Sequence, residues 1–281
     1  MHLERSLTLR GRRFGLIEWP GQGPQLLFLH GWMDQAGVWR RVAEQLSGHR
    51  MALDLRGFGQ SEHNPEGCAY AFAEYLGDLD TWIKTLSGPI VLIGHSMGGT
   101  LASMYAGLRP ERIAALVIVD GLGLADGLAD TVSRLRQHLD GLVPARPARV
   151  FGSLHEAATR LMAIQPGLDA EHAQWMAERG CQEVPGGWQW RSDARHRGRL
   201  AVPYRQDQHI HVLQEIRCPT LSVHPERASF ATADVHLLES AISRLKRVQI
   251  PGTGHAIHLD APLLLSATVK DFLTQNRLSD S

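Results

Sequence analysis

The feature that most constrains this chain is a succession of short, almost continuous apolar runs separated by segments of helical length. Such runs are typical of parallel strands buried on both faces, and their alternation with helices predicts a doubly wound parallel sheet. The expected strands are Leu26–Leu29, Met51–Leu53, Ile90–Ile93, Leu116–Val119, Thr220–Val223 and Val248–Ile250. The expected helices cover about 37–47, 69–86, 97–108, 232–244 and 261–275.

Two parts of the chain depart from this alternation. The first 20 residues alternate apolar and polar side chains around Gly11 and predict a β-hairpin. From Gly121 to Pro203 no buried strand is evident, and the helical pieces Leu128–Leu142 and Leu154–Ile164 predict a helical insertion. We therefore expect a core of residues 1–120 and 204–281, interrupted by a helical segment of residues 121–203, which we call the cap.

Composition narrows the class of protein. Of the 281 residues 43% are hydrophobic, which suffices for a large core, and 29 basic residues balance 29 acidic ones. Because basic and acidic residues are equal in number, the composition does not predict nucleic-acid binding or membrane association. The cysteines at 68, 181 and 218 form no CxxC pair, and no metal-ligand spacing is present, so neither a metal nor a cofactor is predicted. The charged start lacks a signal-peptide pattern, so a cytoplasmic location is expected.

The most specific motif is Gly94-His95-Ser96-Met97-Gly98, which follows one predicted strand and precedes a predicted helix. This is the context of a nucleophile elbow, in which small flanking residues allow a sharp turn that exposes the serine. Ser96 is therefore the candidate nucleophile. The backbone N–H of Met97, at the start of the helix, is a candidate oxyanion donor.

Two further loops carry candidate residues. His30-Gly31-Trp32-Met33 follows the first buried run, and the backbone of Trp32 is the second candidate oxyanion donor. Gly31 permits close approach of backbone to substrate, and His30 is interpreted as a brace for the loop, close to the pocket. Near the C-terminus, Gly252-Thr253-Gly254-His255 follows a predicted strand. His255 is the candidate general base, whereas His258 is interpreted as a packing residue.

Taken together, HGW at 30–32, DLRGFGQS at 54–61, GHSMGG at 94–99 and GTGH at 252–255 resemble the α/β-hydrolase fold superfamily. The segments 30–34 and 186–195 are similar to its serine-hydrolase-like and small bacterial esterase branch. The resemblance implies an eight-stranded, mostly parallel sheet flanked by helices, a helical cap, and a nucleophile, acid and histidine in that order. Because an apolar lid over a serine suits acyl substrates, Trp188 and Trp190 in the cap are candidate pocket residues, with packing in the core as the alternative.

The resemblance fails at the acid. The family's usual acidic position corresponds to Ala228, and alanine cannot orient an imidazole. Asp120 ends a predicted strand 24 residues after Ser96, so it is expected beside the elbow. Glu226, two residues before Ala228, is the alternative acid. A third interpretation of Asp120 is a helix cap at the start of the insertion.

These residues predict a cofactor-free serine hydrolase that cleaves a small or medium carboxylic ester through an acyl-enzyme. Thioester, carbon–carbon bond or perhydrolase chemistry on the same site remains open, as does a non-catalytic ligand-binding protein on this scaffold. The expected partner is a small-molecule ester, without nucleic acid or membrane insertion, and the protein is expected to be a monomer or homodimer.

Overall fold

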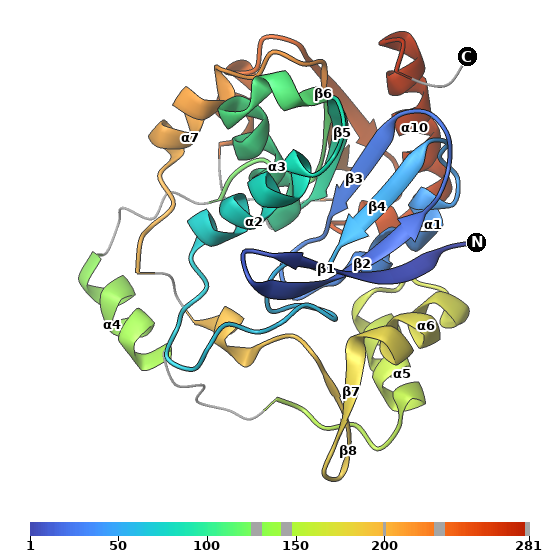
Figure 1. Ribbon diagram of the computed structural model, residues 1–281, viewed down its shortest axis with the longest axis vertical. Helices are drawn as coiled ribbons and strands as arrows, with labels where there is room; N and C mark the ends of the chain where they lie inside the picture. Colours follow the sequence, from blue (N-terminus) through green and yellow to red (C-terminus); the bar gives the residue numbers. More distant parts are fainter. Residues whose placement is uncertain (125–130, 142–147, 199–200, 228–233, 279–281) are drawn as a thin grey trace.

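The computed structural model describes residues 1–124, 131–141, 148–198, 201–227 and 234–278. Its centre is an eight-stranded sheet in the order β1-β2-β4-β3-β5-β6-β9-β10 (Figure 1). The first two pairings, β1 with β2 and β2 with β4, are antiparallel, and all the others are parallel. The strands are β1 (Leu3–Leu9), β2 (Arg12–Trp19), β3 (Gln25–Leu29), β4 (His49–Leu53), β5 (Ile90–His95), β6 (Ile113–Val119), β9 (Thr220–Pro225) and β10 (Leu245–Ile250).

Both faces of the parallel strands are buried, which explains their continuous apolar runs. In β3, Phe28 belongs to one apolar cluster and Leu27 and Leu29 to the other, because successive side chains point to opposite faces. The first cluster includes α1 (Arg40–Ala43) and α10 (Pro262–Gln275). The second includes α2 (Phe72–Lys84) and α3 (Met97–Leu108). The predicted α/β-hydrolase architecture, a mostly parallel sheet between helices, is confirmed.

Three further helices lie between the cap and α10: α7 (Gln206–Leu213), α8 (Val235–Ser240) and α9 (Ile257–Asp260). Short 3₁₀ turns occupy Ala36–Trp39, Pro110–Arg112 and Ala194–Arg197. The sequence did not predict α7. The start of the helix predicted at 232–244 lies outside the described residues, and α8 ends before the predicted boundary.

The chain between β6 and β9 contains more than the predicted helices. It includes α4 (Thr131–Gly141), α5 (Leu154–Ile164) and α6 (Ala170–Gly180). It also contains an antiparallel pair, β7 (Cys181–Val184) and β8 (Gly187–Trp190), which the sequence did not predict within the helical cap (Figure 1). The turn between them is Pro185-Gly186, in which Gly186 adopts a φ of 92° that only glycine takes up at no steric cost.

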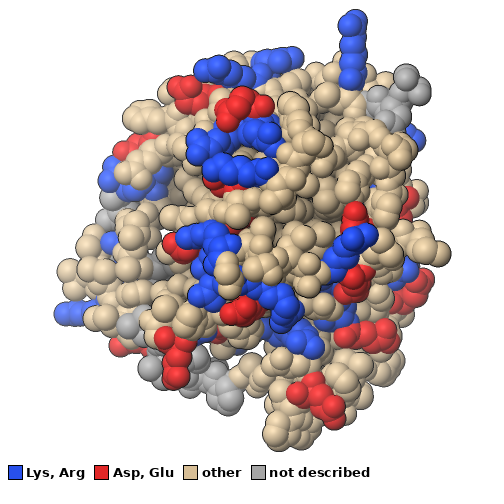
Figure 2. All heavy atoms as spheres, viewed as in Figure 1, with Lys and Arg blue, Asp and Glu red and all other residues tan. Residues whose placement is uncertain are grey.

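Charge is distributed evenly over the face in Figure 2, where Lys and Arg side chains lie beside Asp and Glu. This matches the equal numbers of basic and acidic residues, 29 each. Among the described residues, no helix combines the length and the apolar character that crossing a membrane requires.

Candidate active site

Ser96 lies on a sharp turn between the end of β5 and the start of α3. Its backbone has φ 52° and ψ −120°, a conformation that costs free energy for a residue with a Cβ. A Cβ on Gly94 would overlap the carbonyl oxygen of Gly98, and one on Gly98 would overlap that of Leu29. The two glycines are therefore what allows the turn to close, as the sequence predicted for a nucleophile elbow.

Ser96, His255 and Asp120 form a continuous hydrogen-bonded chain. The Nε2 of His255 lies 3.0 Å from the Oγ of Ser96, and its Nδ1 lies 2.6 Å from Oδ2 of Asp120. Because an ionised carboxylate only accepts, Nδ1 carries the proton and Nε2 presents its lone pair to the serine hydroxyl. The structure thus brings together the three residues that the sequence selected as nucleophile, base and acid.

Asp120 reaches this position because it directly follows β6, the neighbour of β5 in the sheet. Its backbone N–H donates to the carbonyl oxygen of Val223 in β9 at 2.8 Å, which fixes the residue between two strands. The backbone has φ 44°, and the side chain is only 4% exposed. The interpretation of Asp120 as a helix cap is wrong, because residues 121–124, which follow it directly, are not helical and its carboxylate accepts from His255.

The alternative acid lies elsewhere. Glu226 is exposed, and its Oε2 accepts a hydrogen bond from the backbone N–H of Gly252 at 2.8 Å. It therefore braces the turn after β10 and does not orient His255. Ala228, the family's usual acidic position, lies outside the described residues.

The loop after β3 packs against the elbow. A Cβ built on Gly31 would lie 2.9 Å from Nδ1 of His95 and 3.2 Å from the Cβ of Ser96, so only glycine leaves room there. Trp32 follows, and its side chain is 53% exposed. On the other side of Ser96, Met97 begins α3, so its backbone N–H has no acceptor within the helix. Both predicted oxyanion donors thus belong to segments that adjoin the serine.

His30 holds the loop after β3 in place through two hydrogen bonds. The residue is fully buried, its Nδ1 donates to the carbonyl oxygen of Gly31 at 2.7 Å, and its Nε2 accepts from the N–H of Leu55 at 2.9 Å. Burial lowers the pKa of His30 to about 4, so the ring is neutral at pH 7. His30 is a brace, as interpreted from the sequence, and its burial keeps it out of direct contact with a bound substrate.

Comparison with known proteins agrees with this geometry. Residues 26–268 match the model of the alpha/beta hydrolase family. The chain belongs to this family. It is 30% identical to the serine hydrolase-like protein of Danio rerio over 94% of this chain and 85% of that protein. The predicted resemblance to the serine-hydrolase-like branch is thereby confirmed.

Solved structures of other α/β hydrolases superpose closely on this one. A thioesterase domain from the curacin biosynthetic pathway is 30% identical, with a TM-score of 0.88, over 96% of this chain and 99% of that domain. A hypothetical protein from Pseudomonas aeruginosa PAO1 is 29% identical, with a TM-score of 0.85, over 97% of this chain and 98% of its own. The fold therefore extends over nearly the whole length of this hydrolase.

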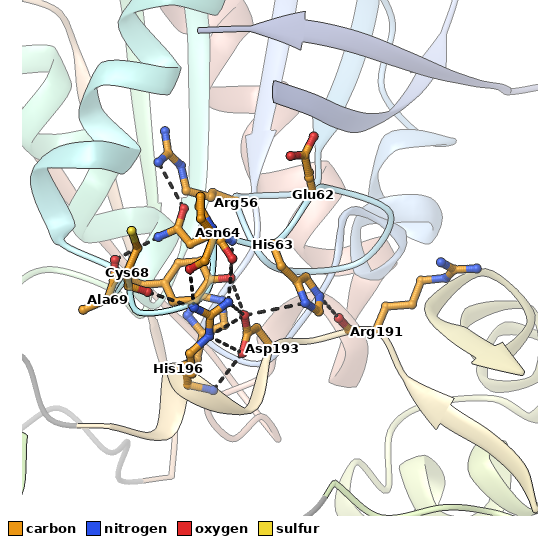
Figure 3. Close-up of polar contacts among 12 residues, drawn as sticks. Arg56, Glu62, His63, Asn64, Cys68, Ala69, Arg191, Asp193 and His196 are labelled. Atoms are coloured by element: carbon orange, nitrogen blue, oxygen red, sulfur yellow. Dashed lines mark hydrogen bonds and ion pairs between the residues drawn. The ribbon is translucent and has the colours of Figure 1, made fainter. Parts of the chain in front are cut away.

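The end of the cap segment is fastened to the loop that follows β4 (Figure 3). The Oη of Tyr70 donates to Asp193 at 2.7 Å, and the guanidinium of Arg195 donates to the carbonyl oxygen of Asn64 at 2.7 Å. The ring of His196 stacks on that of Phe58 with a centroid separation of 3.8 Å. These contacts fix the chain around 193–196 against the hydrolase core.

The chain at 193–196 also contacts the loop after β3, which contains the candidate oxyanion donor Trp32. The indole Nε1–H of Trp32 donates to the carbonyl oxygen of His196 at 3.1 Å. Trp32 thus joins the cap segment to the loop beside Ser96. The sequence singled out Trp32 only for its backbone N–H. In the structure its side chain also links the cap, expected to bind substrate, with the loop expected to bind the oxyanion.

The two tryptophans predicted for the pocket lie in the β7–β8 pair. Trp188 pairs with Phe151 through two backbone hydrogen bonds of 2.8 Å, and Trp190 pairs with Cys181. Both side chains are half-buried against the apolar cluster that contains Phe151. Their described contacts belong to this packing, and none of them brings Trp188 or Trp190 to Ser96.

The sequence did not predict one group of side chains that could ligate a metal. Ligand atoms of Asp34, His95 and His258 lie within 4.8 Å of one another. His258 is fully buried, in keeping with its interpretation as a packing residue. No local spacing reveals this group, because its members are 61 and 163 residues apart along the chain.

Proposed function

We propose that this α/β hydrolase is a serine esterase of the carboxylesterase type, with Ser96 as nucleophile, His255 as base and Asp120 as acid. The observation that carries the proposal is the hydrogen-bonded chain from Ser96 through His255 to Asp120, with distances of 3.0 and 2.6 Å. The backbone N–H groups of Trp32 and Met97 complete the proposed site by binding the oxyanion.

The reaction follows from these positions. His255 Nε2 takes the proton of Ser96 as its Oγ attacks the ester carbonyl, and a tetrahedral oxyanion forms between the donors of Trp32 and Met97. The imidazolium is stabilised by the carboxylate of Asp120. Its proton then passes to the leaving alcohol, and the acyl group remains on Ser96. A water molecule, deprotonated by His255, releases the carboxylic acid and restores the serine.

The choice of substrate is assigned to the cap, residues 121–203. In support, the chain at 193–196 is fixed to the core and contacts Trp32, whose indole is half exposed. A substituent of the ester that extends from Ser96 past Gly31 would reach this tryptophan. We propose a small or medium ester for this reason, and we propose that the reaction needs no cofactor, since the three side chains and two backbone donors account for every step.

A thioester is the second candidate substrate. The thioesterase domain of the curacin pathway, at 30% identity and a TM-score of 0.88, is similar over almost the full length of this chain. The acyl-enzyme mechanism applies to both substrates, because only the leaving group differs. A thiolate is a better leaving group than an alkoxide, so it depends less on the proton delivered by His255.

A matched pair of substrates tests the proposal. We would measure kcat and KM for an ester and a thioester with the same acyl group, using wild type and Ser96→Ala. Ser6→Ala, on the exposed part of β1, is the control. We expect saturable ester hydrolysis that Ser96→Ala lowers by at least about 10⁴-fold and Ser6→Ala leaves unchanged.

Three other results would favour a different substrate, a different nucleophile or a non-catalytic function. A kcat/KM for the thioester far above that for the ester would favour the thioesterase. Turnover that survives in folded Ser96→Ala would refute the nucleophile. Saturable ligand binding with no turnover of either substrate would show a binding protein on a hydrolase scaffold and refute the enzymatic proposal.

A further inference from the structure

Three potential metal ligands converge behind the candidate base. Asp34 lies in the loop after β3, His95 is the last residue of β5, and His258 lies in α9. Their ligand atoms are all within 4.8 Å of one another. The rings of His95 and His258 have a centroid separation of 4.2 Å, and those of His95 and His255 one of 4.7 Å. The group therefore lies one side chain away from the proposed active site.

The hydrogen bond of His95 prepares one of its nitrogens for a metal. Its Nε2 lies 2.9 Å from the carbonyl oxygen of His255, and a carbonyl only accepts, so Nε2 carries the proton. Nδ1 then holds the lone pair, and it has no hydrogen-bond partner among the described residues. Metal-ligating histidines characteristically donate their other N–H to a carbonyl or carboxylate in this way.

His258 makes a stronger case because neither ring nitrogen has a hydrogen-bond partner within the described part of the chain, although the residue is fully buried. Such an unsatisfied buried polar group destabilises the fold and calls for an explanation. Its Nε2 lies 4.0 Å from Oδ2 of Asp34, too far for a direct hydrogen bond. An ion between the two atoms would satisfy both.

Asp34 would supply a negative charge for the ion and a route from solvent to the site. Its side chain is 24% exposed, whereas His258 is closed off from solvent. The N–H of Gln35 donates to Oδ1 of Asp34 at 3.0 Å, which turns Oδ2 toward His258. Burial, with a smaller effect from the charge of Asp54, raises the pKa of the Asp34 carboxyl to about 7, and burial lowers the pKa of His95 to about 3. His95 is thus neutral, the form that binds metals.

We propose that Oδ2 of Asp34, Nδ1 of His95 and Nε2 of His258 bind one divalent transition-metal ion of the Zn²⁺ and Co²⁺ class, with water as a further ligand. Two imidazoles and one carboxylate suit these ions, whereas Mg²⁺ prefers oxygen ligands. Bond lengths of about 2.0–2.2 Å place the ligand atoms of a tetrahedral site about 3.3–3.5 Å apart. The three side chains would therefore move inward slightly on binding.

Calorimetry and Co²⁺ absorption test the site without reference to turnover. Protein freed of metals with a chelator is titrated with Zn²⁺, and with Co²⁺ while visible absorption is recorded. Wild type should bind one ion per chain and give the visible bands of low-coordinate Co²⁺ with nitrogen ligands. Asp34→Asn, which keeps an acceptor for Gln35, should raise the Zn²⁺ dissociation constant at least about tenfold, as should His258→Gln. His155→Gln, on the exposed face of α5, is the matched control and should bind like wild type.

Two results would overturn the proposal. One is the absence of stoichiometric Zn²⁺ binding and Co²⁺ bands in folded wild type, which would favour a buried water as the partner of His258. The other is equal binding by wild type and folded Asp34→Asn, which would place the ion on surface histidines; this variant remains informative even if His258→Gln does not fold. Binding at the site without esterase activity would refute the proposed function and leave the metal site standing.

Discussion

Replacing Arg179 with methionine should destabilise the protein severely, because Arg179 neutralises a carboxylate in the interior. Nη2 of Arg179, in α6, lies 2.6 Å from Oδ2 of Asp54, directly after β4. The side chains are 2% and 0% exposed. Burial alone would raise the pKa of Asp54, but the charge and hydrogen bonds of Arg179, together with His30 and the N–H of Ala36, hold that pKa below its usual value. The pair also anchors α6, part of the cap segment, to the sheet.

The magnitude follows from what Asp54 keeps after the substitution. It would still accept the backbone N–H groups of Ala36 at 2.7 Å and Gln60 at 2.9 Å, but no positive charge would remain on it. Removing one partner of a buried ion pair costs about 3–5 kcal/mol. At about 2–4 °C per kcal/mol, Arg179→Met should lower the melting temperature by roughly 6–20 °C.

Thermal and urea unfolding measure this loss, and Lys84→Gln is the control. Lys84 is 63% exposed and pairs with Asp80 one helical turn away, so its loss should cost less than about 1 kcal/mol. Adding Asp54→Asn to Arg179→Met should cost less than the two single losses together, since each removes the same interaction. A loss below about 1 kcal/mol for Arg179→Met would refute the reasoning that this buried pair holds α6 on the sheet.

Three further outcomes are expected. Asp120→Asn should lower kcat for an ester by about 10²–10⁴-fold with the fold intact, whereas Glu226→Gln should lower it less than about tenfold; the opposite ranking would make Glu226 the acid. Trp188→Ala should lower the free energy of unfolding by about 2 kcal/mol and change kcat for a small acetate ester little; a collapse of kcat in the folded variant would reveal a catalytic role for the cap. The raised pKa of Asp34, about 7, means that its stabilising contribution is full below pH 4 and is lost as pH rises through 7. In chelator, Asp34→Asn should therefore gain stability over wild type at pH 8 and not at pH 4; urea unfolding showing no pH dependence in this difference would contradict the burial argument.

The sheet could be predicted because its strands carry their own signal. Runs such as Ile90–Ile93 are apolar on both faces, and the structure buries them between two helical layers. The β7–β8 pair was missed because its side chains are mostly half-buried and show no continuous apolar run. Pro185 and the two glycines after it mark the turn, and such a cluster does not distinguish a hairpin from a loop.

The candidate site divides in the same way. Ser96 and His255 stand in local motifs, and Asp120 could be located because adjacent parallel strands end at the same edge of the sheet. Asp34 and His258 could not be grouped from the sequence, since only the folded chain brings the loop after β3 to α9. Long-range packing decides such clusters, and one sequence alone contains no record of it.

Covalent labelling tests the central claim most directly, namely that Ser96 is the nucleophile activated by His255. Native protein is treated with a fluorophosphonate probe, digested, and the modified peptide is located by mass spectrometry. Stoichiometric modification at Ser96, parallel loss of ester hydrolysis, and no labelling of folded Ser96→Ala are the predicted results. Modification of a different serine with loss of activity, or full activity in protein that the probe leaves unmodified, would contradict the account.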